Sequence, residues 1–375
     1  MHEEIREFIA ANHGLLLETL RELCLIPAPS HHEEARAEYC RAWLERNGCA
    51  GAYIDGAKNV IFPLGCGESR EITVLAAHTD TVFPDTEPMP YHDDGERIHC
   101  PGCADDTAAV VILMLTAKFF AQKGIVPKKG ILFVCNSCEE GLGNLKGVRA
   151  LFEAYAGRIG CFVSYDSELN CAHDVCVGSH RYEVTAKTVG GHSFNDFGAE
   201  NAIAALAGIV TEIYKIDVPH RGESHTTYNV GTICGGTSVN TIAQSATMLC
   251  EYRSDDFACM EQMRESFARI FAAPREGVEL TVTKVGDRPC GTVDGAEIAA
   301  LKARITPLIE EVIGERVTYK SASTDCNIPL SLGVPALCIG VCRYHGMHTR
   351  EEWLDKASLV PGLEVSLRVA QELTK

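Results

Sequence analysis

Four short apolar segments in this sequence are each followed by polar side chains that can bind a metal ion or carry a proton. These side chains are His78 and Asp80, Glu139 and Glu140, Asp166, and His345 and His348. Imidazole nitrogens and carboxylate oxygens serve in proteins as metal ligands and as general acids or bases. Each pattern alone is also typical of a surface turn or of the acidic start of a helix, so the arrangement of the segments has to be considered.

The four apolar segments have the length and composition of buried strands. They span residues 71–77, 131–135, 161–165 and 336–341, and helical patterns at 107–122 and 147–156 separate several of them. This alternation predicts an α/β fold with a mostly parallel sheet covered by helices. Because ligands of open α/β sheets bind outside the carboxyl ends of the strands, we expect the polar residues to meet at one sheet edge.

The central part of the chain has a different pattern. Between residues 178 and 289 it predicts strand, helix, strand, strand, helix and strand, which is the ferredoxin-like β-α-β-β-α-β order. We therefore expect residues 178–289 to form an inserted domain, with residues 1–177 and 290–375 forming the first domain around it. Glycine-containing stretches at the two junctions suit hinges.

The composition argues against several classes of protein. The 375 residues include 34 Lys and Arg against 51 Asp and Glu, for a net charge of -17. Nucleic acids and anionic membranes bind basic surfaces, so neither is expected as a partner. The first residues are acidic where a signal peptide needs basic ones, and the longest apolar stretch is too short to cross a bilayer. We expect a soluble, cytoplasmic protein.

The 18 cysteines raise one alternative. Without a secretory signal they are expected to be reduced thiols rather than a disulfide framework. Cys100 and Cys103 form one C-x-x-C pair, and Cys135 and Cys138 form a second, so together they could make a four-cysteine zinc site or a redox pair. The interval between the pairs exceeds the roughly 15–20 residues that are usual in a zinc ribbon. We therefore favour thiols without a metal-binding role.

The polar motifs also occur in an order that resembles a known family. They are His78-Thr-Asp80, Gly102-Cys-Ala-Asp105-Asp106, Glu139-Glu140-Gly141, Asp166, Gly190-Gly191-His192-Ser193 and Tyr344-His-Gly-Met-His348. Over nearly the whole chain this order resembles the M20 metallopeptidases, which are co-catalytic zinc exopeptidases and deacylases. The residues around Asp105 and His345 are most similar to the tripeptide aminopeptidase, or peptidase T, branch. Thr107 departs from the pattern, because many members have Lys there.

The resemblance implies a catalytic domain that holds two zinc ions, with cobalt or manganese as substitutes. Asp105 would bridge the two ions. His78 and Asp166 would complete one site, and Glu140 and His348 would complete the other. Nitrogen and oxygen ligands without a thiolate suit zinc. Two such ions supply a Lewis acid and an activated water for amide hydrolysis.

Two carboxylates beside these ligands are expected to have catalytic roles. Asp80 lies two residues beyond His78, so on an extended strand end both side chains point to the same side. Asp80 would then hold the imidazole in its metal-binding tautomer. Glu139, next to the ligand Glu140, would act as the general base for water and then as the acid for the leaving amine.

The inserted domain carries a second group of candidates, His192, Asn240 and Arg253. By resemblance these residues bind substrate, and the domain is a lid that forms a homodimer, so that His192 enters the neighbouring subunit's active site. Arg253 would bind a substrate carboxylate through its two-pronged guanidinium group. The alternatives are a surface salt bridge for Arg253 and a turn residue for His192. Residues 323–325 also resemble a segment near the family's substrate pocket.

Together these features predict a binuclear zinc exopeptidase that hydrolyses small peptides, acting as an aminopeptidase on di- and tripeptides. An N-acyl amino acid deacylase or a carboxypeptidase of the same family would use the same metals and is the alternative within the enzyme class. The alternative from another class is a non-catalytic zinc protein built on Cys100, Cys103, Cys135 and Cys138.

Overall fold

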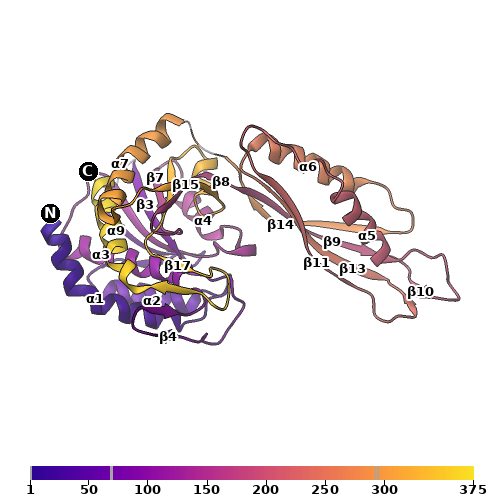
Figure 1. The fold of residues 1–375 in the computed structure, drawn as a ribbon, viewed down its shortest axis with the longest axis horizontal. Coiled ribbons are helices and arrows are strands. Elements are labelled where there is room, and N and C mark those ends of the chain that lie inside the picture. The colour runs from indigo at the N-terminus through magenta and orange to yellow at the C-terminus, as the bar shows by residue number, and fades with distance from the viewer. Residues whose placement is uncertain (1, 68–70, 292, 294) are drawn as a thin grey trace. The chain divides into compact units, whose positions relative to one another are not determined.

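The structure is a computed structural model that describes residues 2–67, 71–291, 293 and 295–375. The described chain divides into two compact units. Unit 1 comprises Met1–Cys176 and Thr292–Lys375, and unit 2 comprises Val177–Gly291. In Figure 1 the elements of unit 1 run from indigo to magenta and then from orange to yellow, because unit 2 is inserted between its two chain segments.

A mostly parallel sheet forms the centre of unit 1. Its strand order is β1-β2-β6-β3-β7-β16-β8-β15. In that order the strands span Tyr53–Ile54, Val60–Leu64, Gly130–Asn136, Ile72–His78, Ile159–Ser164, Ala336–Ile339, Cys171–Cys176 and Thr318–Ala322. β3 pairs in parallel with β6 and β7, β16 with β7, and β15 with β8. The α/β fold expected from the sequence is confirmed.

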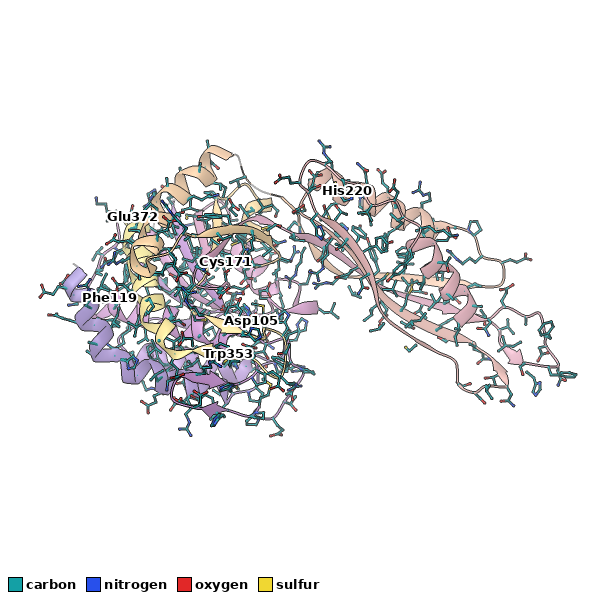
Figure 2. The ribbon with its side chains drawn as sticks, in the orientation of Figure 1. Asp105, Phe119, Cys171, His220, Trp353 and Glu372 are labelled. Carbon is teal, nitrogen blue, oxygen red and sulfur yellow. The ribbon has the colours of Figure 1, made fainter. Side chains whose placement is uncertain are left out.

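Helices pack around this sheet. They are α1 (His2–Cys24), α2 (Glu34–Arg46), α3 (Ala109–Gln122), α4 (Lys146–Ala154), α7 (Gly295–Ile313), α8 (Asn327–Ser331) and α9 (Leu359–Leu373). α3 is apolar on nearly all sides because it lies in the core, in contact with the sheet and with α1 and α9. Phe119 of α3, labelled in Figure 2, packs edge to face on Phe8 of α1 with ring centroids 5.1 Å apart. Within the described residues, none of the helices combines the length and apolar character that a membrane span requires.

A smaller sheet in unit 1 was not expected from the sequence. Its strand order is β17-β18-β5-β4, with bounds Tyr344–His345, Trp353–Asp355, Arg97–His99 and His92–Asp93. β5 leads into the irregular turn η1 (Cys103–Ala108), and α3 begins only after this turn because Asp105 and Asp106 have non-helical backbone angles. Since β5 pairs with β18, the segment before Asp105 lies next to the segment after His348.

Unit 2 has the β-α-β-β-α-β order expected from the sequence, with two additional two-residue strands, β10 and β12. Its antiparallel sheet has the order β11-β13-β9-β14. The elements are β9 (Gly178–Lys187), β10 (Gly191–His192), α5 (Ala202–Ile213), β11 (Thr226–Gly235), β12 (Thr241–Ile242), β13 (Ser245–Ser254), α6 (Phe257–Ala272) and β14 (Glu279–Arg288). Asn201 caps α5 and Asp256 caps α6, because each side chain accepts hydrogen bonds from backbone N–H groups of the first helical turn.

Candidate metal centre

Three neighbouring strands of the main sheet bring polar residues to one edge. His78 is the last residue of β3 and lies opposite Asn136, the last residue of β6. Glu139 and Glu140 follow β6, and Asp166 follows β7. Because β3 is parallel to both neighbours, the three carboxyl ends meet at the edge where ligand sites of this fold class lie.

The carboxylate of Asp105 lies between two histidines. Its Oδ1 is 3.0 Å from Nε2 of His78, and its Oδ2 is 2.9 Å from Nε2 of His348. His348 comes from the loop between β17 and β18, and its Nε2 is also 3.2 Å from Oε1 of Glu140. A carboxylate whose two oxygens face two separate imidazoles has the arrangement of a bridging ligand.

These side chains fit a site for divalent cations. In the described part of the chain, the ligand atoms of His78, Glu139 and Asp166 lie within 4.8 Å of one another, and so do those of His78, Asp105 and Glu140. Among the described residues, the buried Oε1 of Glu140 has the ion-pair contact with Nε2 of His348 and no further hydrogen bond. Carboxylates this close repel one another, and a cation between them relieves that repulsion. The oxygen and nitrogen donors suit zinc, and imidazole with carboxylate also accepts cobalt or manganese.

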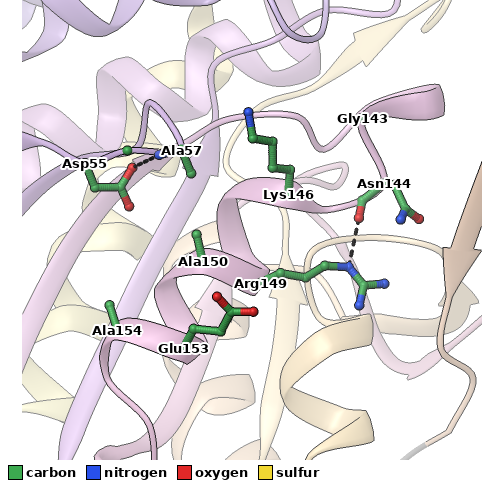
Figure 3. Close-up of a pocket in the computed structure, with 10 residues that line it drawn as sticks. Asp55, Ala57, Gly143, Asn144, Lys146, Arg149, Ala150, Glu153 and Ala154 are labelled. Atoms are coloured by element: carbon green, nitrogen blue, oxygen red, sulfur yellow. Dashed lines mark hydrogen bonds between the residues drawn. The ribbon is translucent and has the colours of Figure 1, made fainter.

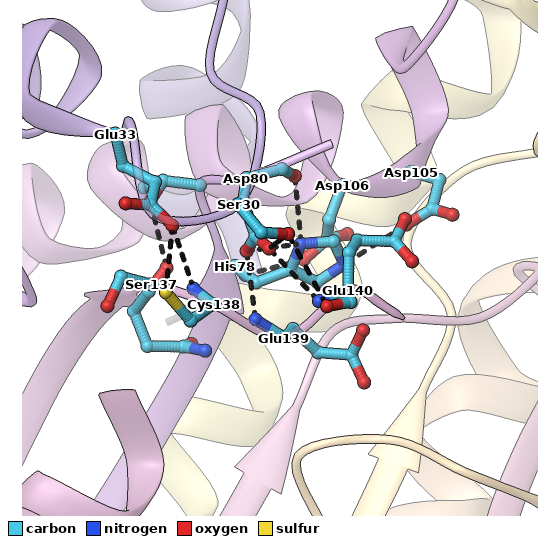
Figure 4. A network of polar contacts seen from close by, with 12 residues as sticks. Ser30, Glu33, His78, Asp80, Asp105, Asp106, Ser137, Cys138, Glu139 and Glu140 are labelled. Carbon is cyan, nitrogen blue, oxygen red and sulfur yellow. Dashed lines mark hydrogen bonds and ion pairs between the residues drawn. The ribbon is translucent and has the colours of Figure 1, made fainter. Parts of the chain in front are cut away.

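Asp80 holds the loop that carries the two glutamates. Its buried carboxylate accepts hydrogen bonds from the backbone N–H groups of Glu139 (2.9 Å) and Glu140 (3.0 Å) and from the hydroxyl of Ser30 (2.6 Å). Nδ1 of His78 lies 3.1 Å from the backbone oxygen of Asp80 and 3.5 Å from its Oδ1. Asp80 therefore connects the imidazole at the end of β3 with the loop after β6, as Figure 4 shows.

Burial and neighbouring charges shift the pKa values of the cluster. Burial raises the pKa of Glu140 to about 7, and burial together with the charge of Asp105 raises the pKa of Asp166. Burial acts in the same direction on Asp105, but contacts with His348 and His78 outweigh it and lower the pKa of Asp105. Contacts with Asp105 and Glu140 raise the pKa of His348 to about 10. The buried carboxylates therefore disfavour one another's charge, and a cation between them would stabilise their charged forms.

Buried residues beyond the site residues expected from the sequence also support this cluster. Glu352 accepts hydrogen bonds from the backbone of the turn that carries Asp105. Oδ2 of Asp325 accepts a hydrogen bond of 2.7 Å from Nδ2 of Asn136, and burial raises the pKa of Asp325 to about 7. Only the resemblance of residues 323–325 to a family segment signalled Asp325. A lone glutamate in a loop gives no local pattern, so Glu352 had no signal.

Thr107, which departs from the family pattern, is a structural residue of η1. Its buried hydroxyl donates a hydrogen bond of 2.5 Å to the backbone oxygen of Gly102 and accepts one of 3.1 Å from the guanidinium of Arg36. Arg36 also donates to the backbone oxygen of Thr79, at 3.0 Å. These contacts hold η1 against the strand end that carries His78.

In unit 2, His192 and Asn240 lie in one corner. β10 pairs with β12, which places His192 opposite Thr241. The backbone N–H of Ser193 donates a hydrogen bond of 3.0 Å to the backbone oxygen of Asn240. The side chains of His192 and Asn240 are exposed. The structure thus brings together two of the three candidates of the inserted domain.

Arg253 lies toward the other end of the same unit. It is near the end of β13, roughly 25 Å along the strand from Ser245 at the usual rise per residue. Its Nε and Nη2 donate hydrogen bonds of 2.7 and 3.1 Å to the two carboxylate oxygens of Glu251. In this structure the guanidinium therefore forms the salt bridge that was the alternative to a substrate contact.

The C-x-x-C cysteines stand apart from the cluster. The metal-ligand groups of the described residues contain no cysteine. Cys100, Cys103, Cys135 and Cys138 are free and buried. The thiol of Cys103 donates to the backbone oxygen of Ile98 at 3.6 Å, and the thiol of Cys138 donates to Glu33 at 3.0 Å. Burial raises the pKa of the Cys103 thiol and raises that of Cys138 to about 12, so both are held protonated.

A separate cavity lies beside the loop after Glu140. It has a volume of 570 Å³, and its lining includes Gly143, Asn144, Lys146 and Arg149 (Figure 3). None of the site residues predicted from the sequence lines it. Nε of Arg149 donates a hydrogen bond of 3.0 Å to the backbone oxygen of Asn144. The cavity is therefore distinct from the metal centre.

A mostly parallel sheet with carboxylates and imidazoles at its carboxyl edge can hold the metal ions that a metal-dependent hydrolase uses. Residues 74–372 match the model of peptidase family M20/M25/M40, and the chain belongs to this family. The family resemblance noted in the sequence and the hydrolase class are confirmed by this match.

Known proteins resemble the chain over most of its length. A succinyl-diaminopimelate desuccinylase from Corynebacterium glutamicum is 23% identical over 339 residues, covering 87% of this chain and 88% of the relative. The aminopeptidase PepT from Bacillus cereus has a TM-score of 0.71 at 19% identity, covering 97% of this chain and 99% of that chain. The YxeP protein of Bacillus subtilis, described as a dinuclear metal-binding peptidase from the M20 family, has a TM-score of 0.64 at 17% identity, covering 98% and 100%. The structural likenesses show a shared fold.

Proposed function

We propose that this protein is a binuclear zinc exopeptidase that acts on small peptides in the cytoplasm. The observation that carries the proposal is the position of the Asp105 carboxylate, with one oxygen facing His78 and the other facing His348. Membership of a peptidase family supports amide hydrolysis as the reaction. The carboxylates around Asp105 supply the negative charge that two divalent cations require.

The side chains at the sheet edge would hold both ions. Asp105 would bridge them. His78 and Asp166 would complete one site, and Glu140 and His348 would complete the other. When bound, the ions supply a Lewis acid for the scissile carbonyl and make water a stronger nucleophile at neutral pH. The donor set supports zinc, with cobalt or manganese as substitutes.

Glu139 would carry the proton. Its carboxylate lies within 4.8 Å of the ligand atoms of His78 and Asp166, so it can reach a water molecule held at the cluster. It would accept the proton of the attacking water and deliver it to the leaving nitrogen, a role that is worth about 10²–10⁴ in rate. Asp80 accepts a hydrogen bond from the backbone N–H of Glu139 and faces Nδ1 of His78. It would therefore keep the Glu139 loop and the imidazole of His78 in place.

The preferred substrates would be di- and tripeptides with a free amino terminus. The fold likeness to PepT and the residues around Asp105 and His345 support this choice. The relative named as a succinyl-diaminopimelate desuccinylase favours the alternative, an N-acyl amino acid deacylase that uses the same metals. A carboxypeptidase of the same family is the other reaction that this centre could perform.

Unit 2 would serve as a lid and as a homodimer contact. The exposed corner that contains His192 and Asn240 would meet substrate, with His192 acting in the neighbouring subunit. An imidazole donor placed at the carbonyl oxygen would stabilise the negative charge that develops there. Arg253 would exchange its contact with Glu251 for a substrate carboxylate.

A substrate panel tests this proposal. The protein, loaded in turn with zinc, cobalt and manganese, is assayed on a tripeptide, on its N-acetylated form, on its carboxy-terminal amide and on an N-acetyl amino acid. We expect fastest turnover of the free tripeptide, slow turnover of both N-acetylated compounds, and loss of activity with a chelator. Faster cleavage of the N-acetyl amino acid would assign the deacylase reaction. Cleavage of the N-acetylated tripeptide, together with no cleavage of the carboxy-terminal amide, would assign the carboxypeptidase reaction.

A further inference from the structure

Glu352 is a buried carboxylate that binds the backbone of the turn carrying Asp105. Its Oε2 accepts a hydrogen bond of 2.7 Å from the N–H of Gly102. Its Oε1 accepts hydrogen bonds of 2.9 and 3.2 Å from the N–H groups of Ala104 and Asp105. The residue is 1% exposed, so the surrounding protein shields these contacts from bulk water. The three N–H donors occupy both carboxylate oxygens of Glu352, which holds the backbone of this turn in place.

The register of the smaller sheet explains how Glu352 reaches the turn. Trp353, the next residue, pairs with His99 at the end of β5. The N–H of Cys100 donates a hydrogen bond of 3.2 Å to the backbone oxygen of Glu352, which continues this pairing by one residue. The chain then turns at Gly102, where φ is 75°. Successive N–H groups in such a turn face inward and form an anion-binding hollow.

Glu352 also positions the loop that carries His348. Glu352 follows His348 in the loop that leads into β18, so it connects this loop directly to the Asp105 turn. Nε2 of His348 and Oδ2 of Asp105 are 2.9 Å apart. Metal–ligand distances vary by only about 0.2 Å in well-formed sites. A small displacement of the turn would therefore weaken the binding of a metal ion that both residues hold.

We propose that Glu352 is a positioning residue that sets the distance between Asp105 and His348, and thereby the affinity of the metal site that these residues share with Glu140. This inference rests on the proposed function, since it assumes that these side chains hold metal ions. Glu352 acts through Asp105 and is not a ligand, because both of its carboxylate oxygens accept backbone N–H groups.

The test is removal of zinc from the zinc-loaded protein by a chromophoric chelator, which yields a dissociation constant for each bound ion. Glu352→Gln keeps the shape of the side chain but replaces one oxygen by an NH₂ donor, so at least one backbone N–H of the turn loses its acceptor. We expect the dissociation constant of the site that contains His348 to rise about 10–100-fold, and that of the other site, which shares Asp105, to rise clearly less. The Glu140→Gln variant identifies which constant belongs to the site of Glu140 and His348.

Asp94→Asn is the matched control. The carboxylate of Asp94 also accepts two backbone N–H groups, from Glu96 at 2.9 Å and Arg97 at 2.7 Å, in the turn between β4 and β5. Its Oδ2 also lies 3.0 Å from Nε2 of His99, but none of these contacts is with the Asp105 turn, so this variant should hold both zinc ions as tightly as the wild type. Glu352→Asp keeps the charge on a shorter side chain and should give an intermediate dissociation constant. It replaces Glu352→Gln in the test if that variant does not fold.

Three results would overturn the inference about Glu352. One is a folded Glu352→Gln protein with a lowered melting temperature but unchanged zinc affinity, which would show a purely structural role. The second is an equal loss of affinity for both zinc ions, and the third is failure of both Glu352 variants to fold, because in either case the effect would not be specific to one site. The proposed function fails in a different way, through a wild-type protein that binds fewer than two zinc ions or hydrolyses no peptide. That result would remove the basis of the inference as well.

Discussion

Nε2 of His348 lies 2.9 Å from Oδ2 of Asp105, although the two residues belong to different chain segments of unit 1. Unit 2 is inserted between these segments in the sequence. The two residues meet because β5, which precedes the turn of Asp105, pairs with β18, which follows the loop of His348. Metal binding at this point would therefore be coupled to the joining of both segments of unit 1.

Glu139 and Glu140 are adjacent in the chain, but substitutions of the two residues are expected to have different effects on metal binding and turnover. Glu139→Gln should keep two metal ions, because the proposed ligands are untouched, and should lower turnover about 10²–10⁴-fold through loss of the proton carrier. Glu140→Gln should lose one metal ion, because an amide is a weaker ligand than a carboxylate. Elemental analysis combined with the tripeptide assay measures both effects.

The Glu139 and Glu140 variants also serve as controls for each other, since both remove one negative charge from the same loop. Both backbone N–H groups donate to Asp80, and the substitutions leave these contacts in place. Two tightly held metal ions in Glu140→Gln, together with fewer in Glu139→Gln, would reverse the two proposed roles.

Much of the fold could be predicted because apolar strands and polar strand ends are local features of the sequence. The strand expected at 71–77 is β3 (Ile72–His78), and the strand expected at 131–135 is β6 (Gly130–Asn136). Their parallel pairing follows from the crossover between them, which contains helix α3. It places His78 and the Glu139 loop together without any knowledge of distant contacts.

The features that were missed depend on long-range contacts. Helix α3 begins at Ala109 rather than at 107, because the backbone of Asp105 and Asp106 is bent away from the helix toward the cluster. Glu352 reaches the Asp105 turn only because β5 pairs with β18, two short strands without a clear alternating pattern.

The C-x-x-C cysteines are expected to be dispensable for metal binding. Single substitutions of Cys100, Cys103, Cys135 and Cys138 by Ser should each leave two metal ions and the peptidase activity in place. Each should also lower the melting temperature, because a buried hydroxyl without a good partner costs about 1–3 kcal/mol. Cys250→Ser is a matched control, since Cys250 is a buried thiol of unit 2. Loss of a metal ion from the C-x-x-C variants alone would support the cysteine site instead.

His192 is expected to act across a homodimer. His192→Ala and Glu139→Gln subunits should each be nearly inactive alone, with His192→Ala reduced about 10²–10³-fold through loss of an oxyanion donor. After subunit exchange, a mixed dimer would contain one active site with both groups intact, so activity should return. The measurement is turnover of the mixture, with the dimer verified by size-exclusion chromatography and mass spectrometry.

Two outcomes would contradict the role of His192 in the partner's site. One is a verified mixed dimer without recovered activity, and the other is a fully active monomer. Ser193→Ala is a control from the same corner, because the backbone N–H of Ser193 contacts Asn240 and this substitution retains it. This variant should keep most of the wild-type turnover.

The most direct measurement of the central claim is anomalous X-ray diffraction from crystals of the zinc-loaded protein, recorded on both sides of the zinc absorption edge. We predict two anomalous peaks about 3.5–4 Å apart, with one carboxylate oxygen of Asp105 bound to each ion. His78 and Asp166 should bind one ion, and Glu140 and His348 the other. A single peak, or a peak at the cysteines instead of at Asp105, would contradict the account.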